Sequence, residues 1–97
     1  MTKALKSTTP AIKPMKYRAT IEVSLKPGHS DPEGETTARL LKELGYPIST
    51  VNVSKVYSIF LEAQTAKNAK DKAEDMCNRL LANPTKDDYT ITIEEQK

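Results

Sequence analysis

Residues 16–26, KYRATIEVSLK, decide the fold because their side chains alternate strictly in character. One side of this stretch would carry only apolar residues, and the other mostly charged or hydroxylated ones. A period of two is typical of a β-strand with one buried face. The apolar side consists of Tyr17, Ala19, Ile21, Val23 and Leu25. This face needs a second layer of structure to cover it.

A helix is predicted to follow the turn sequence PGHSDPEG. The Asp31 side chain can accept a hydrogen bond in the first helical turn, and Pro32 fits the first helical position. Gly45 supplies a left-handed stop, and Pro47 prevents the helix from continuing. The helix has an apolar stripe made of Thr37, Leu40, Leu41 and Leu44.

Two short strands are expected next, joined by a turn at Ser54-Lys55. The first would contain Ile48, Val51 and Val53, and the second would run from Val56 to Ala63. Thr65 then caps a second helix, which Asn83-Pro84 ends. The apolar stripe of this helix comprises Ala66, Ala69, Ala73, Met76, Cys77, Leu80 and Leu81. Residues 88–95 alternate again and predict a last strand.

The predicted order is therefore β-α-β-β-α-β. The economical fold is an α+β two-layer sandwich: a four-stranded, mainly antiparallel sheet with both helices on one face. The domain is expected to span residues 16–97. Residues 1–15 are rich in Lys, Thr, Ser and Pro and are interpreted as a flexible N-terminal extension.

Composition excludes several classes of protein. The chain has 97 residues and a net charge of +2, but residues 19–97 alone carry 10 basic and 13 acidic residues. An acidic domain without clustered Lys and Arg argues against nucleic-acid binding. No apolar run approaches the roughly 20 residues that span a bilayer. The single cysteine cannot form an internal disulfide, so a cytoplasmic location is expected.

The reactive residue types form no catalytic set. Cys77 lies on the apolar helix stripe, away from the helix N-terminus that would lower its pKa, and is interpreted as core. His29 has no second histidine or cysteine with which to bind zinc. Asp31 and Glu33 could hold a hydrated Mg²⁺, but helix capping explains both. We expect no catalytic, cofactor or metal site on this chain, which predicts a small interaction module.

Three segments together resemble the PurS family of phosphoribosylformylglycinamidine (FGAM) synthase. They are YRATIEVSLKPGHSDPEGETTARLLKELGY, VSKVYSIFLEA and AEDMCNRLLANPTKDDYTITIEE, which fall in order over residues 17–95. Two departures stand out: residues 1–15 precede the usual start of the family, and Ser54-Lys55 replaces its usual Gly-Lys turn.

The resemblance implies a subunit of purine biosynthesis without an active site of its own. Whether the chain counts as an enzyme therefore depends on its complex. In that complex a glutaminase subunit (PurQ) releases ammonia, and a synthetase subunit (PurL) uses ATP and Mg²⁺. A PurS dimer would bridge the two. For partner contacts, the matched surface segments supply Asp31, Pro32, Glu33, Gly34, Lys55, Tyr57, Asn83 and Pro84.

One alternative from another class remains open. An ACT-like regulatory domain has a related order of elements and binds amino acids at a dimer interface, and Pro27-Gly28 after the first strand fits that pattern loosely. Stabilisation by one amino acid would distinguish it.

Overall fold

The structure is a computed structural model that describes residues 14–97. Its elements are β1 (Met15–Leu25), α2 (Pro32–Glu43), β2 (Lys55–Ala63), α3 (Ala66–Met76), a π-helical turn η1 (Cys77–Leu81) and β3 (Asp87–Gln96). Strand β1 begins at Met15, one residue before the expected start of the domain. The predicted N-terminal extension lies almost entirely outside the described residues.

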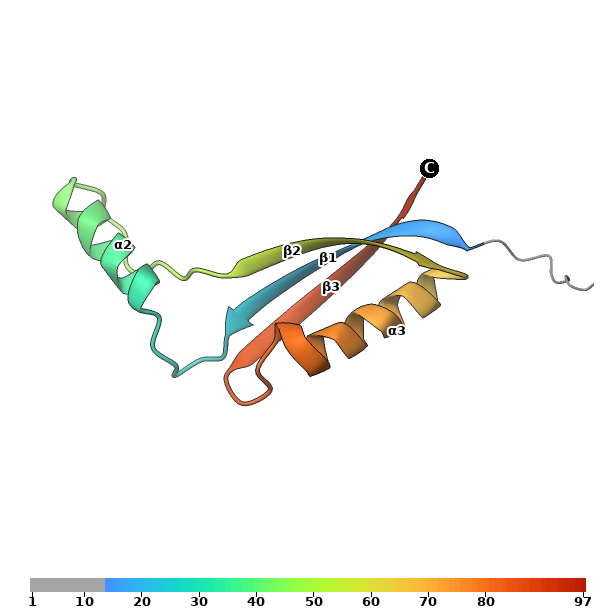
Figure 1. The fold of residues 1–97 in the computed structure, drawn as a ribbon. Helices are drawn as coiled ribbons and strands as arrows, with labels where there is room; N and C mark the ends of the chain where they lie inside the picture. The colour runs from blue at the N-terminus through green and yellow to red at the C-terminus, as the bar shows by residue number, and fades with distance from the viewer. Residues whose placement is uncertain (1–13) are drawn as a thin grey trace, which may run out of the picture.

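The alternating stretch forms the central strand of the sheet. Within residues 14–97 the strand order is β2-β1-β3, and both pairings are antiparallel. Ile21 lies opposite Tyr57 on one side and Ile91 on the other, so apolar residues of all three strands share one face. We call this the inner face, because α3 packs against it (Figure 1).

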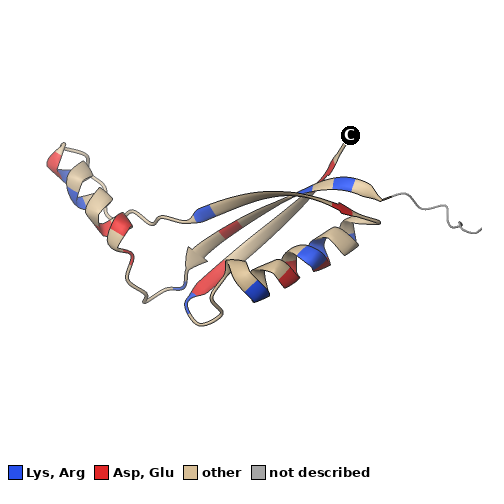
Figure 2. Cartoon of the chain, in the orientation of Figure 1, with Lys and Arg blue, Asp and Glu red and all other residues tan. Residues whose placement is uncertain are grey.

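Small side chains on α3 let the helix approach the sheet closely. Ala73 and the following Cys77 are fully buried with Ala19 and Ile21 of β1. Ala69 is fully buried with Tyr17 and Ala63. Burying a side chain such as Ile21 contributes roughly 1.5–3 kcal/mol. The opposite side of α3 carries acidic and basic residues that face solvent (Figure 2). The prediction of an amphipathic helix capped by Thr65 is confirmed, because the Thr65 hydroxyl accepts from Asn68 N–H at 3.0 Å.

The end of this helix differs from the predicted regular stripe. The N–H of Ala82 donates to the carbonyl of Cys77 at 3.0 Å, which makes η1 a wider π-type turn. Leu81 stays against the core, but Leu80 is 83% exposed. The prediction that Leu80 belongs to the buried stripe is therefore wrong, because the sequence does not reveal where a helix widens.

The predicted four-stranded sheet is also wrong. The described chain has a three-stranded antiparallel sheet in the order β-α-β-α-β. Residues 48–53, predicted as a strand, are assigned neither strand nor helix. We call residues 48–53 the strap. The expected packing of both helices on one face fails as well, because α2 lies beyond the end of the sheet without substantial contact with any strand (Figure 1).

The strap runs along α2 because the Asp31 carboxylate accepts hydrogen bonds from the backbone of both segments. Asp31 Oδ1 accepts from Gly34 N–H at 3.0 Å, which caps α2 as predicted. Asp31 Oδ2 accepts from Val53 N–H at 2.9 Å. The backbone also approaches closely here, since a Cβ on Gly34 would overlap the carbonyl oxygen of Val51. We call residues 32–53, which comprise α2, the strap and the turn between them, the arm.

Helix α2 is followed by a glycine in the left-handed conformation, as the sequence predicts. Gly45 has φ of +99°, and its N–H donates to the carbonyl of Lys42 at 2.9 Å. Tyr46 N–H donates to the carbonyl of Leu41 at 3.1 Å, which completes a Schellman motif.

Replacing Gly34 by Ala tests the close contact within the arm. Alanine favours a helix interior by about 1 kcal/mol over glycine, but displacing a backbone carbonyl costs typically 1–3 kcal/mol. We therefore expect Gly34→Ala to lower the free energy of unfolding, measured by urea titration, and the exposed neighbour Glu35→Ala to change it by less than about 0.5 kcal/mol. Equal stability of the two variants would contradict the contact.

The Asp31 carboxylate also predicts a dependence on pH. The hydrogen bond from Val53 N–H, and then that from Gly34 N–H, lower the pKa of Asp31. Its contribution to stability is thus present above the ordinary aspartate pKa of about 3.9 and is lost as the pH falls through the lowered folded-state pKa. We expect Asp31→Asn to be less stable than the parent near neutral pH. This difference should shrink in acid, whereas a constant difference across the titration would count against the bond.

Candidate partner-binding surface

Cys77 is placed as a core residue rather than as a nucleophile. Its side chain is fully buried beneath the sheet. Burial raises the pKa of the Cys77 thiol, and the negative charge of Glu74 raises it further. A nucleophilic cysteine needs the thiolate, which these surroundings disfavour. Among the described residues, no group of three or more His, Cys, Asp and Glu side chains is arranged to hold a metal ion.

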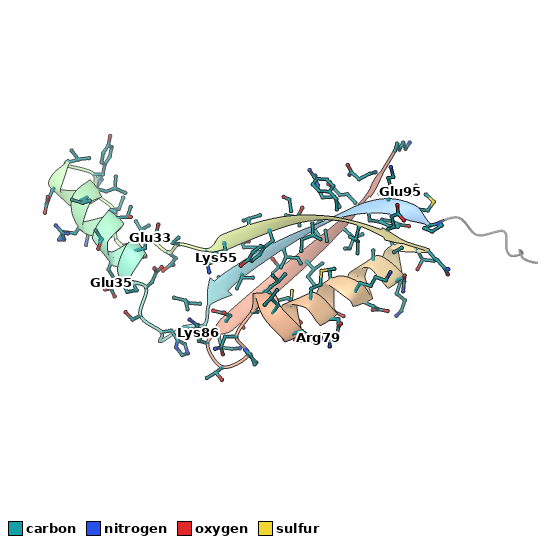
Figure 3. All side chains as sticks on the ribbon, in the orientation of Figure 1. Glu33, Glu35, Lys55, Arg79, Lys86 and Glu95 are labelled. Atoms are coloured by element: carbon teal, nitrogen blue, oxygen red, sulfur yellow. The ribbon has the colours of Figure 1, made fainter. Side chains whose placement is uncertain are left out.

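The first set of predicted contact residues lies at the start of α2. Asp31 and Gly34 are occupied in holding the strap, and Pro32 fills the first helical position. Glu33 is exposed in the first turn, where Figure 3 labels it near the strap. A groove of about 650 Å³ runs along α2 and the strap, bordered by His29, Glu35, Arg39, Lys42, Thr50 and Asn52.

Lys55 and Tyr57 have different surroundings although they share a strand. Lys55 is exposed at the first residue of β2, facing the gap between the sheet and the arm (Figure 3). Lys55, Glu33 and Lys86 border a hollow of about 220 Å³ at this end of the sheet. Tyr57 is half-buried on the inner face beside the core.

Asn83 and Pro84 form the turn that joins η1 to β3. The Asn83 side-chain oxygen accepts from Thr85 N–H at 2.8 Å, and Asn83 N–H donates to Asp87 Oδ2 at 2.8 Å. Both residues are exposed. The structure thus gives each predicted contact residue a place in one of three separate segments, and shows turn or capping roles for Asp31, Gly34 and Asn83.

Several large apolar side chains that the sequence patterns did not place at the surface are exposed. Leu40, Leu44 and Tyr46 of the arm are 47%, 73% and 56% exposed. On the sheet face away from α3, which we call the outer face, Val56 and Phe60 of β2 are also exposed. The sequence does indicate the exposed apolar residues of β2, because Val56 and Phe60 are apolar at positions where a half-buried strand usually carries polar residues.

No helix within residues 14–97 is long and apolar enough to cross a membrane.

The core position of Cys77 can be tested with a matched neighbour. Truncating a buried side chain by one heavy atom costs about 1 kcal/mol, whereas an exposed helix position tolerates alanine. We expect Cys77→Ala to lower the free energy of unfolding by about that amount, and Asn78→Ala to leave it nearly unchanged. Rapid reaction of Cys77 with iodoacetamide in the native protein would contradict the burial.

Comparisons with known proteins agree on one family. The sequence model described as PurS, phosphoribosylformylglycinamidine (FGAM) synthase, matches residues 18–95. The synthase subunit PurS of Methanocaldococcus jannaschii is 39% identical over 80 residues, which cover 81% of this chain and 96% of that protein. Subunit PurS of Bacillus subtilis is 29% identical over 80 residues, covering 81% and 94%.

Solved structures give the same result. Thermus thermophilus PurS has a TM-score of 0.77 and 37% identity, covering 84% of this chain and 99% of that one. A chain in the structure of PurLQS from Thermotoga maritima has a TM-score of 0.72 and 28% identity, covering 84% and 98%. On a family match that spans nearly the whole described domain, the chain belongs to the PurS family of FGAM synthase.

Proposed function

We propose that this chain acts as a homodimeric bridge without reactive groups of its own, assembling the glutaminase PurQ and the synthetase PurL of FGAM synthase in the cytoplasm. The family match and the PurLQS structure of a relative support its place as a subunit of that synthase. The observation that carries the bridging role is the exposed apolar surface of a small domain whose one thiol is buried.

The chemistry of the complex explains why such a subunit is useful. PurQ would release ammonia from glutamine, and PurL would use ATP and Mg²⁺ to activate the amide that ammonia attacks. Ammonia that escapes into water is protonated and no longer nucleophilic. Holding two active sites in a fixed relation therefore accelerates the overall reaction through positioning alone. Neither ATP nor Mg²⁺ needs to bind this chain.

A second copy of the chain is the partner that best accounts for the exposed apolar residues of α2. A helix with an apolar stripe is normally stabilised by packing that stripe against another element. Leu40 and Leu44 find no such element within the described chain. The core is also thin, because five of the nine buried apolar residues within residues 14–97 are alanine. A domain of this kind gains much of its stability from association, as obligate homodimers do.

The homodimer predicts that the α2 stripe controls the mass of the protein. We expect Leu40→Gln combined with Leu44→Gln to shift the chain from dimer to monomer in light scattering coupled to size-exclusion chromatography. Lys42→Gln, at an exposed position on the opposite side of the same helix, should leave the dimer intact. A parent protein that is monomeric at every concentration would contradict the homodimer.

The bridging role predicts a dependence of synthesis on this chain. With purified PurL and PurQ and saturating ATP, Mg²⁺ and glutamine, we expect glutamine-dependent FGAM formation to require the chain, while ammonia-dependent formation by PurL proceeds without it. Cys77→Ala should support the glutamine reaction as well as the parent does. Full glutamine-dependent synthesis in the absence of the chain would contradict the proposal.

A further inference from the structure

Strand β3 forms one edge of the described sheet, so its backbone is paired with a neighbour on one side only. Lys26 N–H donates to the carbonyl of Lys86 at 2.7 Å, just beyond the last pair of the β1–β3 ladder. In an antiparallel ladder, every second residue bonds to the neighbouring strand, and the residues between direct both N–H and C=O away from it. The residues of β3 that direct their backbone outward are therefore Asp87, Tyr89, Ile91, Ile93 and Glu95.

The middle of this edge carries nothing that would prevent another strand from pairing with it. Residues 89–93 read Tyr-Thr-Ile-Thr-Ile, which are strand-forming residues without charge, proline or glycine. The register with β1 is also continuous, without a bulge, from the first residue of β3 to the last. Soluble proteins usually interrupt an exposed edge with one of these features, because unpaired backbone groups attract other strands. The middle of β3 is thus able to bind an extended segment of another chain.

Acidic residues stand at both ends of this uncharged segment. β3 contains four acidic residues and no basic one. Asp87 and Glu95, whose backbone points outward, take part in no ion pair within residues 14–97 (Figure 3). The two acids that do form ion pairs are Asp88, with Lys26, and Glu94, with Arg18.

These charges make a second copy of the chain a poor partner for the edge. Two β3 strands related by a two-fold axis would pair antiparallel, and in full overlap the pairing is centred on Ile91. Asp87 would then lie opposite the partner's Glu95, and Asp88 opposite the partner's Glu94, at both ends of the pair. Like charges directly opposite on adjacent strands are destabilising. The edge therefore favours a different chain that carries the opposite charge.

A hollow at the start of β3 offers a place for a basic side chain. It has a volume of about 270 Å³ and lies between the turn after η1 and the first residues of β3. Ala82, Pro84 and Tyr89 give it apolar walls, and Asp87 also borders it. Asp87 Oδ2 accepts from Asn83 N–H at 2.8 Å, which holds the carboxylate in place. A Lys or Arg side chain can pack its apolar stem on such walls and bring its charge to the carboxylate.

We propose that an extended segment of an enzyme subunit of the synthase pairs with the outward edge of β3. The segment has an uncharged middle and a Lys or Arg at each end, one in the hollow beside Asp87 and one opposite Glu95. Backbone hydrogen bonds supply the affinity, and the two charged ends fix the register. This inference rests on the bridging role proposed above and specifies one of its contacts. It leaves the apolar stripe of α2 available to a second copy.

The alternation of the β3 amides gives a test with an internal control. We expect the amides of Tyr89, Ile91 and Ile93 to exchange at least about tenfold more slowly in the complex with PurL and PurQ than in the chain alone. The amides of Thr90 and Thr92 bond to β1 and should exchange slowly in both states. Exchange is carried out on the intact complex, quenched, and read residue by residue by mass spectrometry with electron-transfer fragmentation. Repeating it with each enzyme separately identifies the subunit that supplies the segment.

A charge reversal tests the chemistry of the partner. We expect Glu95→Lys to weaken the binding of that enzyme subunit by about two- to tenfold in a fluorescence titration. Glu62→Lys makes the same change at an exposed position of β2, at the same end of the sheet but on its opposite edge. This control should bind within about twofold of the parent.

The possible results separate the two proposals. If the chain forms no complex with PurL and PurQ, the bridging role and the edge pairing are overturned together. A complex in which the outward amides exchange as fast as in the chain alone would overturn the edge pairing and leave the bridge standing. Outward amides that are already protected in the chain alone would show that the edge is covered without an enzyme, which also overturns the pairing. Equal affinities of Glu95→Lys and Glu62→Lys would contradict the basic ends of the segment.

Discussion

The Asp31 carboxylate holds two backbone N–H groups that are far apart in the sequence, and the shape of the molecule follows from that. One oxygen caps α2 through Gly34, and the other binds Val53 in the strap. Because the strap is bound to the helix, the described sheet stops at three strands. The helix then lies away from the sheet with Leu40 and Leu44 uncovered, so one local hydrogen-bonding choice leads to an apolar surface that needs a partner.

Local signals in the sequence predicted the individual elements well. Strict alternation located β1 and β3, and Asp31-Pro32 and Gly45 marked the ends of α2. The strap was misjudged because Ile48, Val51 and Val53 do not keep a period of two, and because the N–H of Val53 donates to Asp31 rather than to a neighbouring strand. An apolar stripe shows that a helix is covered, but it does not show which chain covers it.

The predicted contact residues illustrate a similar limit. The motif Asp31-Pro32-Glu33-Gly34 was selected as a surface, and the structure reveals an internal role for its first and last members. Glu33, Lys55 and Pro84 are exposed. The exposed Leu80 could not be predicted from spacing, because the π-type turn places it outside the stripe while Leu81 stays inside. A subunit that acts by positioning needs such surfaces more than it needs reactive groups.

Hydrogen exchange of the α2 amides as a function of protein concentration tests the central claim most directly. If the helix is covered only by a second copy, its amides should exchange slowly at high concentration and much faster on dilution below the dissociation constant. The β1 amides should stay protected throughout. Protection of α2 that does not change with concentration would show that the helix is covered within its own chain, which contradicts this account.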